Sequence, residues 1–98
     1  MNPHQELVSM ADLVRRFTRT DRSRALLRVF ADDYYASGIG FTDKEAADSV
    51  GVARCHTAIT NFINYGLIEP VSGAEKPRRC KLKSRGLALF ARMKDVPA

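Results

Sequence analysis

The hydrophobic residues near the N-terminus recur at the spacing of an α-helix. Polar residues fill the positions between them, so one face of a helical wheel is apolar. That face collects Leu7, Met10, Ala11, Val14 and Phe17. Asn2 can cap such a helix, and Pro3 suits its first position. The pattern predicts an amphipathic helix over residues 3–18.

A second helical pattern begins at Thr20 or Asp21 and runs to about Ser37, where Gly38 can end it in the left-handed conformation. Its expected inward positions are Leu26, Val29, Phe30 and Tyr34. The chain from Gly38 to Phe41 is then expected to form one short strand.

Thr42 and Glu45 have the spacing of a capping box, which marks the start of a third helix. Gly51 ends this helix after two or three turns, and a further helix is expected over residues 53–65. Two short helices joined by a tight glycine-containing turn are typical of a helix-turn-helix. We therefore expect this motif over residues 42–66.

The segment 67–83 has the pattern of a β-hairpin. "LIEPV" is apolar, "SGAEKP" suits a turn, and "RRCKLK" alternates charged with apolar residues. Ser84 can cap a last helix over residues 85–94. The 98 residues are long enough for one hydrophobic core, so a single domain over residues 1–98 is expected.

This order of elements resembles that of the winged helix-turn-helix proteins, most closely the MarR-like group. "NYGLIEPV" is similar to the family's junction of recognition helix and first wing strand, and "CKLKSRGLAL" to its second wing strand and next helix. The resemblance covers roughly Asp21 to Met93, and Lys83-Ser84 stands where the family usually has threonine. It implies an α+β, mostly helical fold, with an extra N-terminal helix and a C-terminal helix after the wing.

The distribution of charge along the chain says more about a binding partner than the overall composition does. The net charge is +5, and residues 76–98 carry eight basic side chains against Asp95. Such a concentration of positive charge favours a polyanionic partner. No apolar run approaches the roughly 18 residues that cross a bilayer, which leads us to expect a cytoplasmic protein without a membrane partner.

The helix over residues 53–65 offers two different faces. Val52, Cys55, Phe62 and Ile63 lie within about 60° of Ile59 on a helical wheel. The expected DNA-reading residues, on the opposite face and its border, are Arg54, Thr57, Thr60, Asn61 and Asn64. Arginine can pair with guanine and asparagine with adenine in the major groove. The alternative is a solvated surface helix.

Basic residues form two further clusters. In the wing, Lys76, Arg78, Arg79 and Lys81 are expected to contact phosphates or the minor groove, the alternative being a solvated hairpin. Six arginines between Arg15 and Arg28 could contact flanking DNA backbone, or pair with Asp32, Asp33 or a partner's acids.

Neither a metal site nor a catalytic site is expected. Cys55 and His56 are adjacent on a helix and therefore diverge by about 100°. Cys80 and His4 could in principle complete a metal site with them, but the four residues do not have the sequence spacing of known zinc ligands. The sequence has no triad order, phosphate loop or HExxH motif, so we expect a protein that is not an enzyme and has no cofactor.

Apolar faces beyond one core suggest self-association. The residues expected in a two-fold interface are Leu7, Met10, Val14, Phe17, Leu89 and Met93. The alternative is a monomer in which the N-terminal helix folds onto its own domain. The prediction is a homodimeric repressor of transcription that binds double-stranded DNA, with no effector defined. Two alternatives remain open: a plasmid or phage replication or partition factor, and a winged-helix module that binds another protein.

Overall fold

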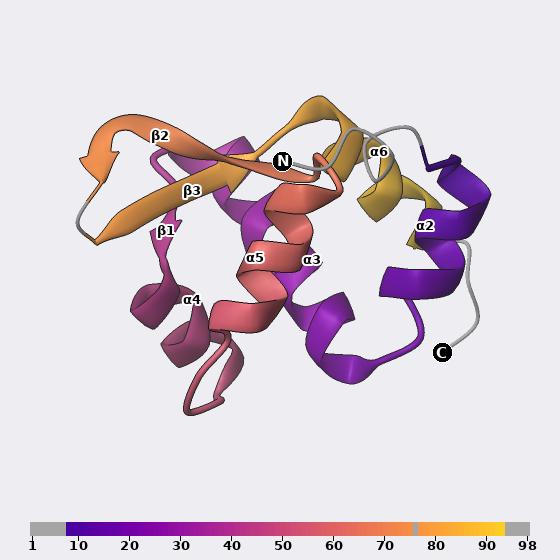
Figure 1. Ribbon diagram of the computed structural model, residues 1–98, viewed down its shortest axis with the longest axis horizontal. Helices are drawn as coiled ribbons and strands as arrows, with labels where there is room; N and C mark the ends of the chain where they lie inside the picture. Colours follow the sequence, from indigo (N-terminus) through magenta and orange to yellow (C-terminus); the bar gives the residue numbers. More distant parts are fainter. Residues whose placement is uncertain (1–7, 76, 94–98) are drawn as a thin grey trace.

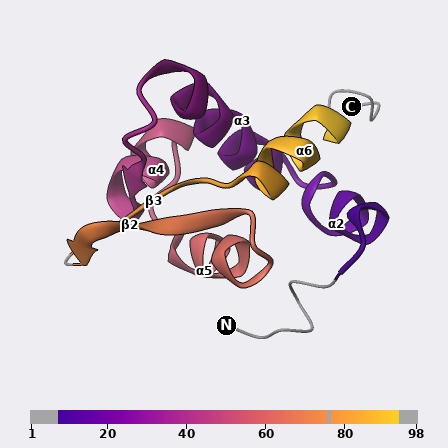
Figure 2. The same ribbon diagram turned by 90° about the horizontal axis from the view of Figure 1, so that it is seen from above.

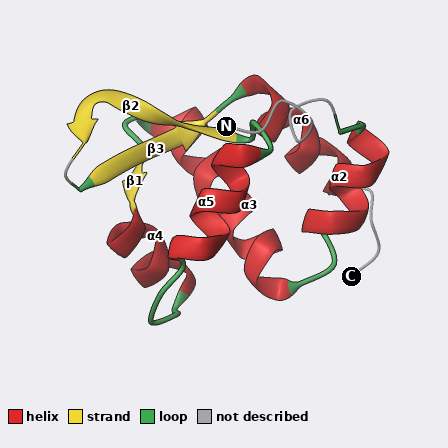
Figure 3. Cartoon of the chain, in the orientation of Figure 1, coloured by secondary structure: helices red, strands yellow, loops and turns green. Residues whose placement is uncertain are grey.

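The computed structural model describes residues 8–75 and 77–93. Over these residues the protein is α+β and mostly helical, with five helices and one three-stranded antiparallel sheet (Figures 1 and 3). This agrees with the class of fold expected from the sequence. In the described part of the chain, no helix combines the length and the apolar character needed to cross a membrane.

The first described helix, α2 (Met10–Phe17), is shorter than the sequence predicted. Val8 and Ser9 precede it, and the Ser9 hydroxyl accepts a hydrogen bond from the Asp12 amide at 3.2 Å. Ser9 is therefore the N-cap, and the prediction of a helix through residues 8 and 9 was wrong. The predicted cap Asn2 and the rest of residues 1–7 lie outside the described residues.

Helix α3 (Asp21–Ala36) agrees with its prediction. The Thr20 hydroxyl accepts from the Ser23 amide at 3.3 Å, and Ser37 ends the helix. Leu26 and Phe30 are fully buried as expected, but Tyr34 lines a hollow beside Leu82 and is 45% exposed. The expectation that Tyr34 faces inward was wrong.

Two short helices, α4 (Asp43–Val50) and α5 (His56–Asn64), follow the strand β1 (Phe41–Thr42). The predicted capping box is confirmed: Thr42 and Glu45 exchange hydrogen bonds of 2.9 and 3.1 Å. Gly51 ends α4 at a φ of 75°, a conformation that glycine adopts without strain. Helix α5 begins at His56, later than predicted.

The sheet is completed by a hairpin of β2 (Ile68–Glu75) and β3 (Arg78–Leu82), and α6 (Ser84–Met93) follows it. The strand order is β1-β3-β2, with Phe41 opposite Cys80 and Ile68 opposite Leu82. Cys80 and Leu82 are buried while Lys81 is exposed, which confirms the alternation predicted for this strand.

Helix α3 lies at the centre of the core and packs against α4, α6 and β3. Helix α2 packs against α6, and its last residue, Phe17, makes edge-to-face contacts with Phe62 and Tyr65, with ring centres 5.2 Å apart in both pairs. Figure 2 shows α5 on the lower side of the molecule, with α3 and α6 above it in the view. This packing leaves one long side of α5 uncovered.

Candidate functional site

The uncovered side of α5 is polar. Thr57 and Asn61 are exposed, and Thr60 and Asn64 are half-buried. Ile59 and Phe62, on the other side, are each 1% exposed. The two faces predicted for this helix are therefore confirmed, although the exposed Arg54 precedes the helix instead of lying on it.

A group of polar side chains joins α4, α5 and β3 at the beginning of α5. Arg78 donates from Nε and Nη2 to the two carboxylate oxygens of Asp43, at 3.1 and 3.0 Å. The same Nη2 lies 3.0 Å from the Thr60 hydroxyl. His56 Nδ1 lies 2.8 Å from the Asp43 carboxylate. We call Asp43, His56, Thr60 and Arg78 the Asp43 cluster.

The sheet register brings this cluster together. Thr42 lies opposite Arg79, so Asp43 at the start of α4 comes beside Arg78 at the start of β3. Cys55, just before α5, donates from its thiol to the Asp43 carbonyl at 3.3 Å, which draws His56 close. Asp43 and Arg78 are 35 residues apart and share no local pattern. Sequence reasoning therefore missed Asp43 and His56.

The cluster also changes the acidity of its carboxylate. Burial by itself would raise the pKa of Asp43, but the hydrogen bonds from Arg78 and His56 and their positive charge outweigh that effect. The pKa of Asp43 therefore lies below its ordinary value of 3.8. Asp43 stays ionised at neutral pH and holds Arg78 in place.

We expect Asp43→Asn to lower the free energy of unfolding at pH 7 by about 1–2 kcal/mol, because charge-assisted hydrogen bonds are lost from a partly exposed site. The folded-state pKa is depressed, so this contribution is fully present above the unfolded pKa and disappears as pH falls through the folded one. Urea unfolding of both proteins at pH 7 and near pH 3 measures it.

Asp48→Asn is the matched control, since Asp48 is an exposed carboxylate on the same helix. It should leave stability nearly unchanged at both pH values. An Asp43→Asn effect equally large at pH 3 would contradict the assigned role of the carboxylate.

The second hairpin arginine is also engaged within the chain. Arg79 Nη1 donates to the Gly40 carbonyl and to the Glu45 carboxylate, at 2.9 Å in each case. The pKa of Glu45 is lowered, first by its hydrogen bond with the Thr42 backbone and then by Arg79. The sequence suggested that Arg78 and Arg79 are exposed on the hairpin. In the structure they bind Asp43, Glu45 and the Gly40 carbonyl instead. Lys81 is exposed, and Lys76 lies outside the described residues.

The residues expected in a two-fold interface serve another purpose. Phe17, Leu89 and Met93 are 5%, 0% and 2% exposed, because α6 packs against both α2 and α3 and Phe17 packs on the end of α5. Met10 and Val14 are half-buried against the same core. Packing within one chain therefore covers these residues without a second copy, and the homodimer stays a prediction. Leu7 lies outside the described residues.

The two thiols show no sign of chemical activation. Cys55 and Cys80 are buried and free, and burial raises the pKa of both. Although Cys55, His56 and Asp43 lie together, the thiol contacts the Asp43 backbone and keeps its proton. Within residues 8–75 and 77–93, no three histidine, cysteine or acidic side chains gather where they could hold a metal ion. His4 is outside this part.

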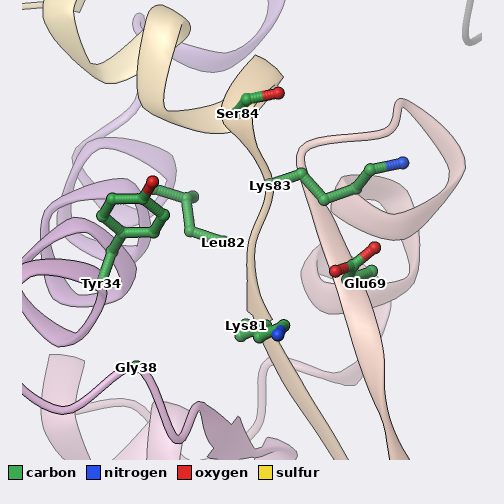
Figure 4. Close-up of a pocket in the computed structure, with 7 residues that line it drawn as sticks. All are labelled: Tyr34, Gly38, Glu69, Lys81, Leu82, Lys83 and Ser84. Carbon is green, nitrogen blue, oxygen red and sulfur yellow. The ribbon is translucent and has the colours of Figure 1, made fainter.

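A hollow of about 470 Å³ lies between α3, β2, β3 and the start of α6. Figure 4 shows Tyr34 and Leu82 on one side of β3, and Lys83 and Glu69 on the other. These side chains do not point toward a common centre. The hollow therefore presents no grouped set of catalytic or ligand-binding atoms, and the polar face of α5 remains the stronger candidate site.

No protein-family model, curated protein or solved structure matches this chain at a significant level.

Proposed function

We propose that this protein is a winged helix-turn-helix protein that binds double-stranded DNA site-specifically and regulates transcription. In this proposal α4 and α5 are the helix-turn-helix, α5 enters the major groove, and the β2–β3 hairpin is the wing. Binding at an operator would block transcription by occupying the DNA.

The observation that carries the proposal is the exposed polar face of α5 on a strongly basic chain. Asn61 presents a side-chain amide, which can donate to and accept from an adenine edge. Thr57 is small and lies one turn before it, so the helix could approach the bases closely. The face lacks acidic residues, which phosphates would repel, and the net charge of +5 favours a polyanion.

The Asp43 cluster supports the same proposal by a structural route. It ties the hairpin to the first turns of α4 and α5 through Arg78, with Thr60 of α5 as one acceptor. A DNA-recognition helix must be held rigidly by its neighbours, because a hydrogen bond to a base requires its donor to be placed within about 0.5 Å. Arg78 would then position α5 instead of contacting phosphate.

Asn61→Ala is expected to reduce the preference for the best duplex over a scrambled one by about 1–3 kcal/mol, while affinity for the scrambled duplex stays near wild type. The preferred duplex is first selected from a randomised library, and both affinities are then measured at fixed salt. Equal losses on both duplexes would exclude Asn61 as a base reader. Failure of the wild type to bind any duplex would reject the proposed function.

A second candidate function is a module that binds another protein. It is favoured by the exposed apolar side chains of Tyr34, Tyr35 and Ile39, of which Tyr35 is 71% and Ile39 63% exposed. An exposed apolar group of this kind is a common feature of protein contacts. The duplex-binding measurement separates the two candidates, since this patch offers no charge for DNA.

A further inference from the structure

The junction of α2 and α3 is strongly basic, as is the segment 78–85 of the hairpin and the start of α6. Between residues 15 and 28 it has one acidic residue, Asp21, against six arginines. We call residues 15–28 the α2–α3 corner. Its arginines are Arg15, Arg16, Arg19, Arg22, Arg24 and Arg28.

The backbone of the corner is held by several hydrogen bonds. Thr18 donates to the Val14 carbonyl from its amide and its hydroxyl, at 3.1 and 2.5 Å. Arg24 Nη1 donates to the Thr18 carbonyl at 3.0 Å, and Thr20 caps α3. Arg19 therefore projects from a turn that is fixed on both sides, and its side chain is exposed.

The corner lies along α5. Phe17 packs on Phe62 and Tyr65 near the end of α5, and the Arg16 guanidinium lies over the Tyr65 ring at 4.9 Å. At the other end of α5, Arg22 is near enough to Cys55 for its charge to oppose, without overcoming, the rise in the pKa of that thiol that burial and Asp43 cause. Figure 1 shows the corner on one side of α5, and α4 with the hairpin tip on the other.

Two arginines of the corner, Arg19 and Arg22, differ from two of the others in their contacts. Arg15 pairs with Asp12 and Arg24 with a carbonyl, but Arg19 and Arg22 make no ion pair with any described residue. Arg22 also lies in the first turn of α3, where the helix dipole disfavours a cation. An arginine that is unfavourable locally and has no partner points to an anion outside the chain.

We propose that the α2–α3 corner binds the DNA phosphate backbone through Arg19 and Arg22, on the side of α5 away from the hairpin tip. This inference rests on the proposed function and names a second contact for the same interface. A helix in the major groove, which is about 12 Å wide, has a ridge of phosphates on each side. The corner faces one ridge. Near the other, Arg78 and Arg79 are bound to Asp43 and Glu45.

The test compares single variants that each remove one positive charge: Arg19→Ala, Arg22→Ala and, as the matched control, Arg92→Ala. Arg92 is exposed on α6, which packs on α2 and α3 and lies above and to the right of α5 in Figure 2. Affinities for the preferred and scrambled duplexes are measured from 0.05 to about 0.3 M salt, and urea unfolding checks that each variant is folded.

For Arg19→Ala and Arg22→Ala we expect the slope of log affinity against log salt to become shallower by about 0.9, with affinity about fivefold weaker near 0.15 M salt. The affinity for the preferred duplex and the affinity for the scrambled duplex should fall by the same factor, because a phosphate contact carries no sequence information. Arg92→Ala should keep the wild-type slope, and Arg22→Lys should restore it.

Three results would overturn the inference. If Arg19→Ala and Arg22→Ala have the slope of Arg92→Ala while the wild type binds DNA, the corner is not a contact and the proposed function stands. If their loss is confined to the preferred duplex, they read bases instead of phosphates. If the wild type binds no duplex, the proposed function fails and the inference fails with it.

Discussion

Phe17→Ala is expected to lower the free energy of unfolding by about 3–5 kcal/mol, the usual cost of deleting a buried aromatic ring. Phe17 is 5% exposed, and its ring meets Phe62 and Tyr65 edge to face. Because this is a contact between α2 and the end of α5, the substitution should also loosen the packing of α5.

Urea unfolding at two protein concentrations measures this effect and tests its origin. A core role predicts a large loss that is the same at both concentrations. Val14→Ala, on the same helix but half-buried, is the control and should cost clearly less. If Phe17→Ala instead kept wild-type stability and converted a dimer to a monomer in sedimentation, Phe17 would belong to an interface between copies.

The second large effect is expected at Gly40. Its φ is 85°, and a Cβ built there would lie 2.3 Å from the Cys80 carbonyl oxygen in β3. The Gly40 amide donates to the buried Asp33 carboxylate at 2.9 Å, and its carbonyl accepts from Arg79. The residue therefore cannot shift without breaking contacts to α3 and β3. We expect Gly40→Ala to cost about 3 kcal/mol through backbone strain and overpacking together.

Gly38→Ala separates these two causes. Gly38 has a similar φ of 66°, but nothing lies within 4 Å of a Cβ at that position. Gly38→Ala should therefore lower the free energy of unfolding by about 1 kcal/mol, through backbone strain alone. Thermal or urea unfolding of both variants provides the comparison. Equal losses would mean that the close approach of Gly40 to β3 contributes nothing.

Both predictions depend on contacts between elements that no local sequence pattern contains. Phe17 was expected in an interface because its helix has an apolar face, yet that face is covered by α6 and by the end of α5. An apolar stripe indicates that a residue will be buried. Which surface buries it depends on where other elements pack.

The sequence by itself determined the local elements of this protein. The capping box of Thr42 and Glu45, the start of α3 near Thr20 and the end of α4 at Gly51 depend on interactions over three or four residues, so their spacing predicted them. The alternation in β3 and the two faces of α5 were likewise visible, because burial repeats with the period of the element.

Only the tertiary structure decided which charges are available. In the sequence, both pairs of arginines, Arg78 with Arg79 and Arg19 with Arg22, belong to basic clusters. The register of β1 with β3 places Asp43 and Glu45 within reach of Arg78 and Arg79. No described carboxylate pairs with Arg19 or Arg22. A side chain several bonds long can satisfy its charge on any element within reach, so its partner is set by packing between residues far apart in the chain. Arg78 therefore ties β3 to the start of α4, whereas Arg19 is exposed and makes no ion pair with a described residue.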